Sequence, residues 1–97
     1  MNPKKIRIKI GIAWYRKEQW KFLKSSCDDS DNLENTYEEW LQNAKKIELD
    51  LAVKGYDPER IDINIELLNK WCKRNKKPNT TATRSEYVTI LLKEKIV

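Results

Sequence analysis

The chain has 97 residues, which suits one domain, because single hydrophobic cores usually form from about 100 to 150 residues. Hydrophobic residues make up 39% of it, with only two Gly and three Pro, so we expect one globular, helix-rich domain over residues 1–97 rather than a disordered or fibrous chain. It has no histidine and too few glycines for a phosphate-binding loop, so His-based catalysis and nucleotide-binding motifs are excluded and we expect no cofactor and no metal.

No stretch of the sequence approaches the about 20 apolar residues of a membrane-spanning helix. The N-terminal segment is basic but alternates apolar and charged residues, whereas a signal peptide needs a continuous apolar stretch of about 7 to 15 residues. We therefore expect a soluble cytoplasmic protein with no membrane partner. Cys27 and Cys72 lack a CxxC spacing, which favours two reduced thiols over a disulfide or a zinc site.

Two segments show the period-two alternation of half-buried strands. The first ends at Trp14, and its apolar positions are Ile6, Ile8, Ile10 and Ile12. The second follows the turn-forming Gly55 and Asp57-Pro58, and its apolar positions are Ile61, Ile63 and Ile65. Arg7 and Lys9 on the first strand and Asp62 on the second carry opposite charges, which favours pairing of the two strands.

Two helices are expected between the strands. Residues 16–26 form a short helix that buries Trp20 and Leu23. A longer helix spans about residues 32–54, opened by a capping box of Asp31 and Glu34, although Thr36 with Glu39 offers a rival start one turn later. Its apolar stripe consists of Leu33, Tyr37, Trp40, Leu41, Ala44, Ile47 and Leu51.

Two further helices follow the second strand. Asn64 can cap a helix that runs to about Asn75, and Thr83 with Glu86 can cap the last one. The elements therefore predict an α+β fold in the order β-α-α-β-α-α. We expect a two-stranded antiparallel ribbon packed by four helices that lie over the isoleucine face, because a helical hairpin after the first strand would return the chain to the end of that strand.

Two surfaces are candidates for protein contacts. Trp14 ends the first strand beside Tyr15 and Arg16, and its aromatic side chain can remain partly exposed there. Leu49 and Val53 lie off the apolar stripe of the long helix, on its opposite face. A homodimer would use this face or the edge of the second strand, because the charges of Arg7 and Lys9 oppose pairing of two first strands.

The net charge is +5, with basic ends and an acidic segment over residues 25–50. The one basic cluster without acidic residues among it lies at the turn between the last two helices, and it consists of Lys70, Lys73, Arg74, Lys76, Lys77 and Arg84. Such a cluster could contact a polyanion, which makes weak nucleic-acid binding through residues 70–84 an alternative function. Charge runs at helix ends are ordinarily solvated and lysines are favourable at a helix C-terminus, so a solvated helix end is the simpler explanation of the cluster.

Acidic side chains offer the remaining route to catalysis. They form two groups, which are Asp28, Asp29 and Asp31, and Glu34, Glu38 and Glu39. A divalent ion could bind either group in principle, and an enzyme with a carboxylate-based site is therefore the second alternative. The acidic run lacks the spacing of a calcium loop, and acids near a helix start are stabilising by themselves, so the sequence leans against catalysis.

Several short motifs resemble those of a family of small uncharacterised bacterial proteins of about this length. The motifs are Trp14-Tyr15-Arg16-x-Glu18-x-Trp20, Thr36-Tyr37-Glu38-Glu39-Trp40, Trp71-Cys72 and Arg84-x-Glu86-Tyr87. The resemblance implies a self-contained bacterial domain over roughly residues 13–92 and carries no activity. Taken with the aromatic residues, the sequence favours a small non-catalytic protein-protein interaction module with an unidentified protein partner.

Overall fold

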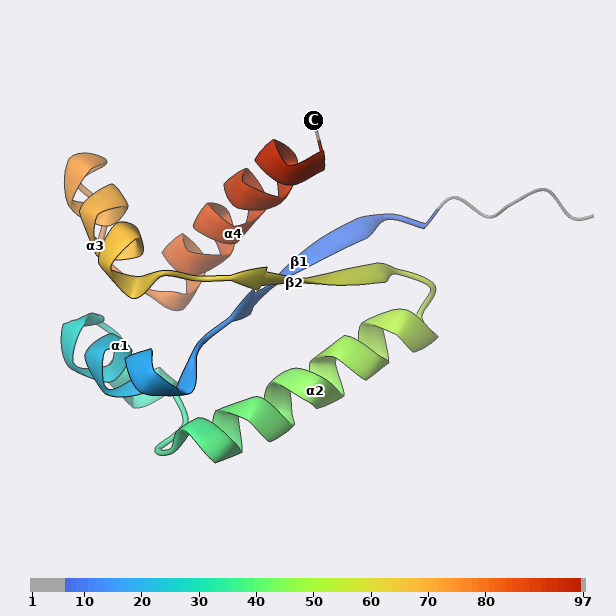
Figure 1. The fold of residues 1–97 in the computed structure, drawn as a ribbon, viewed down its shortest axis with the longest axis horizontal. Helices are drawn as coiled ribbons and strands as arrows, with labels where there is room; N and C mark the ends of the chain where they lie inside the picture. The colour runs from blue at the N-terminus through green and yellow to red at the C-terminus, as the bar shows by residue number, and fades with distance from the viewer. Residues whose placement is uncertain (1–6, 97) are drawn as a thin grey trace, which may run out of the picture.

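A computed structural model describes residues 7–96 of the chain (Figure 1). Ile6, the first apolar position of the predicted alternation, lies outside the described residues. The elements, in chain order, are β1 (Lys9–Trp14), the 3-10 helix η1 (Lys17–Gln19), α1 (Trp20–Ser26), the 3-10 helix η2 (Ser30–Asn32), α2 (Tyr37–Val53), β2 (Asp57–Asp62), α3 (Ile65–Arg74) and α4 (Thr81–Ile96). The predicted order β-α-α-β-α-α is therefore wrong, since two 3-10 helices interrupt it.

The two strands pair in parallel, from Lys9 opposite Asp57 to Trp14 opposite Asp62, so the predicted antiparallel ribbon is wrong. The reason is the unequal length of the two intervening helices. At 1.5 Å per residue, the 7 residues of α1 rise about 10 Å and the 17 residues of α2 about 25 Å. The displacements of the chain along the two helices therefore do not cancel, as they would in a helical hairpin. Instead, α2 carries the chain back to the N-terminal end of β1, as a crossover helix does.

The parallel register also changes the ion pairs between the strands. Lys9 faces two acids of β2, with its Nζ atom 2.9 Å from Asp57 Oδ2 and 3.1 Å from Glu59 Oε1. Asp62 instead accepts a hydrogen bond from Arg16 Nε at 2.9 Å. The charge of Lys9 is thus compensated within the ribbon itself.

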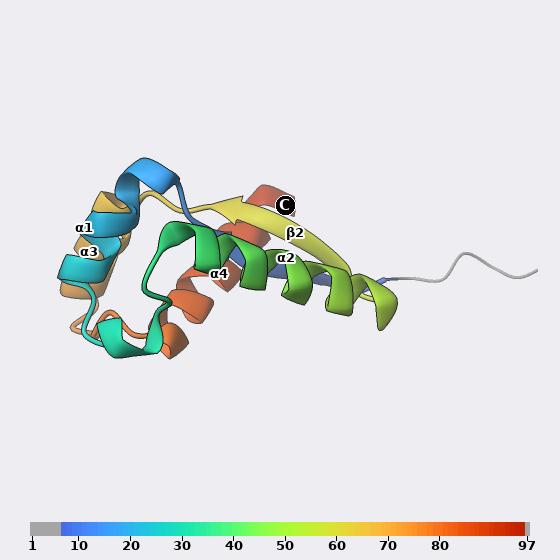
Figure 2. The same cartoon turned by 90° about the horizontal axis from the view of Figure 1, so that it is seen from below.

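Helices cover both faces of the ribbon, and not only the isoleucine face. Trp14 packs against Trp40 of α2, with 5.3 Å between the ring centroids, which places α2 on the face of Ile10, Ile12 and Trp14. Gly11 belongs to the opposite face and lies against α4. Figure 2 shows α2 in front of the ribbon and α4 behind it, while α1 and α3 lie side by side beyond one end of the strands. The ribbon is therefore the middle layer of three.

Side-chain caps fix where α2 and α3 begin. Thr36 Oγ1 accepts a hydrogen bond from the backbone N–H of Glu39 at 3.1 Å, so α2 begins at Tyr37, and the predicted start near residue 32 is wrong. Asn64 Oδ1 accepts from the N–H of Leu67 at 3.1 Å, which confirms the predicted cap of α3. α4 begins at Thr81, directly after Thr80, so the predicted cap at Thr83 is wrong. Competing caps one turn apart look equal in sequence, and packing decides between them.

Gly11 allows α4 to approach the ribbon closely. A Cβ atom at this position would lie 2.7 Å from Cγ1 of Val88 and 3.3 Å from Cγ1 of Ile61, and both of these side chains are buried. Because neither neighbour can move into solvent, we expect Gly11→Ala to lower the free energy of unfolding by about 1 to 3 kcal/mol. Urea denaturation measures the change.

The matched control for Gly11→Ala is the double variant with Val88→Ala, which removes the closest contact. The double variant should be more stable than the sum of the two single losses predicts, because the two substitutions compensate each other. Strictly additive losses of stability in the double variant would show that the close approach of α4 to the ribbon does not depend on Gly11.

Candidate functional site

An open groove of about 460 Å³ runs along β1, between α2 and α4. Its floor is residues 10–13 of β1. One wall is formed by Trp40, Asn43, Ala44 and Ile47 of α2. The other wall is formed by Thr81, Arg84, Ser85, Val88 and Thr89 of α4. Residues 32–34 and Tyr15 line the remainder.

The floor of the groove is the outer edge of a β-strand. The N–H of Asp57 donates to the carbonyl of Ile8 at 2.9 Å, and the N–H of Ile63 donates to the carbonyl of Trp14 at 3.1 Å. In a parallel ladder alternate residues direct their backbone groups to the same neighbour, so the even-numbered residues of β1 face β2. The N–H and C=O groups of Gly11 and Ala13 therefore point away from β2, and no other strand within residues 7–96 pairs with them.

The two walls differ in chemistry. On the α2 side, the apolar Ile10 and Ile12 of the strand are continuous with Trp40, Ala44 and Ile47, and the side chain of Ile47 is 53% exposed although it is aliphatic. On the α4 side, the strand contributes only Gly11 and Ala13, and the exposed positions of the helix carry the hydroxyl groups of Thr81, Ser85 and Thr89. The groove thus has a mainly apolar wall, in which Asn43 is the polar residue, and a hydroxyl-bearing wall.

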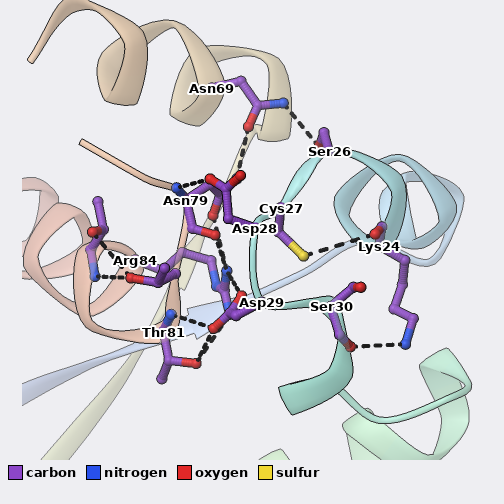
Figure 3. A network of polar contacts seen from close by, with 12 residues as sticks. Lys24, Ser26, Cys27, Asp28, Asp29, Ser30, Asn69, Asn79, Thr81 and Arg84 are labelled. Carbon is purple, nitrogen blue, oxygen red and sulfur yellow. Dashed lines mark hydrogen bonds and ion pairs between the residues drawn. The ribbon is translucent and has the colours of Figure 1, made fainter. Parts of the chain in front are cut away.

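A buried ion pair lies beside the groove, which Arg84 helps to line (Figure 3). Arg84 is 4% exposed, and its Nη1 atom lies 2.9 Å from Asp29 Oδ1. The same nitrogen donates to Asn79 Oδ1 at 2.9 Å, and Asp29 Oδ2 accepts from the backbone N–H of Thr81 at 2.7 Å. Asp29 thereby caps the start of α4 from a loop 52 positions earlier in the sequence. This network holds the α4 wall against the loop that follows α1.

Asp28 and Asn79 extend the network towards α3. The N–H of Asp28 donates to the carbonyl of Asn79 at 2.8 Å, and the N–H of Asn79 donates to Asp28 Oδ2 at 2.7 Å. Asn79 Nδ2 donates to Asn69 Oδ1 at 2.8 Å, and Asn69 Nδ2 donates to Ser26 Oγ at 3.1 Å (Figure 3). The acidic loop therefore has a structural role, which is to tie α1, α3 and α4 together.

The ion pair makes stability depend on pH. Burial of Asp29 raises the pKa of its carboxyl, but hydrogen bonds from Arg84 and Thr81 outweigh this effect and lower the pKa from 3.8 to about 2. A lowered folded-state pKa gives stability that is present above the ordinary pKa and is lost as the pH falls through the folded value. We expect about 2 kcal/mol of stability to be lost between about pH 5 and pH 2 through this group alone.

Urea denaturation at a series of pH values tests this expectation, with Asp29→Asn as the matched variant. The variant should be less stable than the wild-type protein at pH 6, and the difference should shrink towards pH 2. A constant difference across this range would contradict the assignment of the pH dependence to Asp29.

The three residues predicted as a surface after the first strand are placed differently from one another. Tyr15 is 5% exposed and belongs to the core. Trp14 is half-buried, between Trp40 and the guanidinium of Arg60, whose Cζ lies 3.9 Å from the ring centroid. Arg16 is exposed and paired with Asp62. These residues do not form one exposed patch.

Leu49 and Val53 lie on the exposed side of α2, with 66% and 78% of their surface accessible. Neither residue lines the groove, which is bordered by the other side of the same helix. They remain a candidate contact surface that is separate from the groove. Leu49 therefore provides a useful counterpart to Ile47, because both are exposed aliphatic residues on one helix.

The basic cluster divides into engaged and solvent-facing residues. Lys77 Nζ is 2.6 Å from Glu86 Oε1, and Lys70 Nζ is 3.3 Å from Glu66 Oε1. Arg84 is buried with Asp29, so its guanidinium does not face solvent with the others. The exposed remainder, for which no ion pair is found among the described residues, is Lys73, Arg74 and Lys76.

The carboxylates proposed for a catalytic site are dispersed among structural contacts. Glu39 takes part in the cap of α2, Glu38 pairs with Lys17 at 3.1 Å, and Glu34 accepts a hydrogen bond from Asn43 at 2.8 Å. Within residues 7–96 no group of three His, Cys, Asp or Glu side chains is arranged to hold a metal ion. Cys27 and Cys72 are free thiols.

Sequence reasoning missed the groove residues of α4 and the role of Gly11. Ser85 and Thr89 lie four positions apart, so they share one side of the helix, and this spacing was visible in the sequence. What the sequence could not show is that this side faces the outer edge of β1. Gly11 and Ala13 gave a second signal, since they are small residues within an isoleucine-rich strand, which indicates a close approach by another element.

No family model, curated protein or solved structure matches the chain. No helix within the described part of the chain is long and apolar enough to span a bilayer. The chemistry of the groove is therefore what indicates a function.

Proposed function

We propose that the chain is a protein-interaction domain that binds an extended segment of another protein as an additional strand along the outer edge of β1. The observation that carries the proposal is the combination of an open groove and a free strand edge at its floor. A strand edge presents a row of backbone donors and acceptors, which another extended chain can satisfy. The bound segment of the other protein would thus form a third strand of the sheet, next to β1.

The geometry of the groove suits a single extended chain. An added strand would lie about 4.8 Å from β1, with the backbone groups of Gly11 and Ala13 as its partners. α2 and α4 would then cover its two faces, as they cover those of β1 (Figure 2). Such a strand would also remove Ile47 from water, and exposed aliphatic surface of this kind is typical of a contact site.

A second candidate function is weak nucleic-acid binding, which Lys73, Arg74 and Lys76 favour because they are exposed at one helix end. The three charges would supply a small electrostatic contribution that decreases steeply with salt. We rank it below segment binding because Lys70, Lys77 and Arg84 of the same cluster are engaged with carboxylates.

Selection from a displayed library of random peptides tests the proposal, with peptides somewhat longer than the 6 residues of β1. A selected peptide is then titrated against Ile47→Asp and Leu49→Asp. Ile47→Asp should weaken binding by at least about tenfold, because it places a charge in the apolar wall of the groove. Leu49→Asp makes the same chemical change outside the groove and should leave the affinity unchanged.

The opposite pattern, in which Leu49→Asp abolishes binding and Ile47→Asp does not, would move the contact to the face of Leu49 and Val53. A library that yields no groove-directed peptide, together with an oligonucleotide complex at physiological salt that Lys73→Gln removes, would favour the nucleic-acid alternative. Either result would overturn the proposal.

A further inference from the structure

We infer that the segment bound in the groove is uncharged over its central residues and alternates large aliphatic side chains with small hydroxyl-bearing ones. The inference rests on the proposed function and specifies its ligand. It follows from the difference between the two walls, since successive side chains of an added strand point to opposite walls.

The aliphatic positions are set by the α2 wall. Residues of the added strand that lie opposite Ile10 and Ile12 point to the same side of the ribbon as these two residues. They would enter the space beside Ala44 and the exposed Ile47. Ala44 is the smallest side chain of this wall, so a branched aliphatic residue fits better here than a second small one.

The small positions are set by the α4 wall. Residues opposite Gly11 and Ala13 point to the side of α4, which approaches the strand closely at Val88. The exposed groups there include the hydroxyls of Ser85 and Thr89, and the Thr89 hydroxyl donates to the carbonyl of Ser85 at 3.0 Å, which leaves it able to accept. A Ser or Thr of the ligand can donate to such a hydroxyl and satisfy its own polar group.

Charge is disfavoured in the middle of the groove. Among its lining residues only Glu34 and Arg84 are charged, and the Glu34 carboxylate already accepts a hydrogen bond from Asn43 at 2.8 Å. Arg84 is already compensated by Asp29 at 2.9 Å. A charged ligand side chain beside Ile47 or Val88 would lose water without gaining a partner. The complementary ligand is therefore neutral there.

The strand β1 of a second copy is a poor occupant of the same groove. Each copy of β1 is covered by its own α2 and α4, and a helix is about 10 Å thick. The helices of two copies would therefore collide before their strands could reach hydrogen-bonding distance. An extended segment without such cover enters freely, which is why we assign the groove to a partner segment and not to a dimer.

Two synthetic peptides of equal composition test the inference. One alternates Val or Ile with Ser or Thr over the length of β1, and the other groups the same aliphatic residues together, with identical solubilising tails. We expect the alternating peptide to bind at least about tenfold more tightly, because only it can place every aliphatic side chain on the α2 wall. Affinity is measured by calorimetry, and the site by backbone amide shifts.

Further variants and measurements distinguish the possible failures. Ala44→Leu fills the α2 wall and should weaken the alternating peptide, whereas Ala52→Leu, an exposed change on the same helix, should not. Equal affinity of the two peptides, with shifts at Gly11 in both, would overturn the alternation and leave strand addition intact. A free protein of twice 11.6 kDa whose Gly11 amide is already protected would place a second copy in the groove and overturn the inference.

Discussion

Replacement of Trp40 by Ala is expected to lower the free energy of unfolding by about 3 to 5 kcal/mol, which is enough to unfold a domain of ordinary stability. Trp40 is 7% exposed and is the centre of an aromatic cluster. Its ring centroid lies 5.3 Å from that of Trp14, 5.1 Å from Tyr15, 5.9 Å from Trp20 and 5.4 Å from Tyr37. The loss therefore combines the transfer of a large apolar side chain with a cavity at the contact between α1, α2 and β1.

Thermal and urea denaturation measure this effect, and Gln42→Ala is the matched control, because Gln42 is exposed on the same helix. The control should change stability by less than about 0.5 kcal/mol. Similar melting temperatures for the two variants would show that the buried face of α2 is assigned incorrectly.

Replacement of Arg84 by Met is expected to cost about 3 to 5 kcal/mol, because it leaves the carboxylate of Asp29 buried without its partner. The side-chain volume is nearly retained, so the loss reports on charge and hydrogen bonding. Asp29 Oδ1 and Asn79 Oδ1 would both lose the Nη1 donor that lies 2.9 Å from each. The start of α4 and the groove wall that it forms would loosen together.

The double variant Arg84→Met with Asp29→Asn is the control for this interpretation. It removes the uncompensated charge, so it should be more stable than Arg84→Met alone at neutral pH. Lys73→Met changes an exposed cation of the same cluster and should be close to neutral. A double variant that is as unstable as the two single losses added together would show that the ion pair is not the source of the effect.

Local patterns in the sequence predicted some of the elements and missed the bounds of others. β2 begins at Asp57, which was predicted as part of a turn, and ends at Asp62, so Ile63 and Ile65 lie beyond it. The alternation around Ile10 and Ile12 corresponds to β1, and Asn64 caps α3 as its position suggested. These features depend on neighbouring residues alone, which is why they are readable from one sequence. The start of α2 was harder, because Asp31 with Glu34 and Thr36 with Glu39 have the same capping spacing, and only the second pair forms the cap.

The direction of β2 could not be predicted in the same way. It depends on where α1 and α2 carry the chain in space, and the expectation of a helical hairpin was wrong although the helices expected over residues 16–26 and about 32–54 already differed in length. The pairing of Lys9 with Asp57 and Glu59 follows from the parallel register and was invisible for that reason. Long-range geometry, rather than local preference, accounts for this part of the fold.

The groove and the role of Arg84 also depend on long-range contacts. In the sequence, Arg84 belongs with the lysines of the preceding turn, whereas in the fold it lies against Asp29, 55 positions earlier. A charged residue that becomes buried by pairing with a distant one has no local signature. The exposed Ile47 is similar, since its position on the apolar stripe predicts burial, and the open edge of β1 is what leaves it accessible.

Backbone amide hydrogen exchange at β1 tests the central claim most directly. In the free protein, the amides of Ile10 and Ile12, which face β2, should exchange slowly, while those of Gly11 and Ala13, which face the groove, should exchange quickly. With a saturating peptide selected for binding, Gly11 and Ala13 should become protected to a degree similar to that of Ile10 and Ile12. Unchanged fast exchange at Gly11 and Ala13 in the saturated complex would contradict strand addition at this edge.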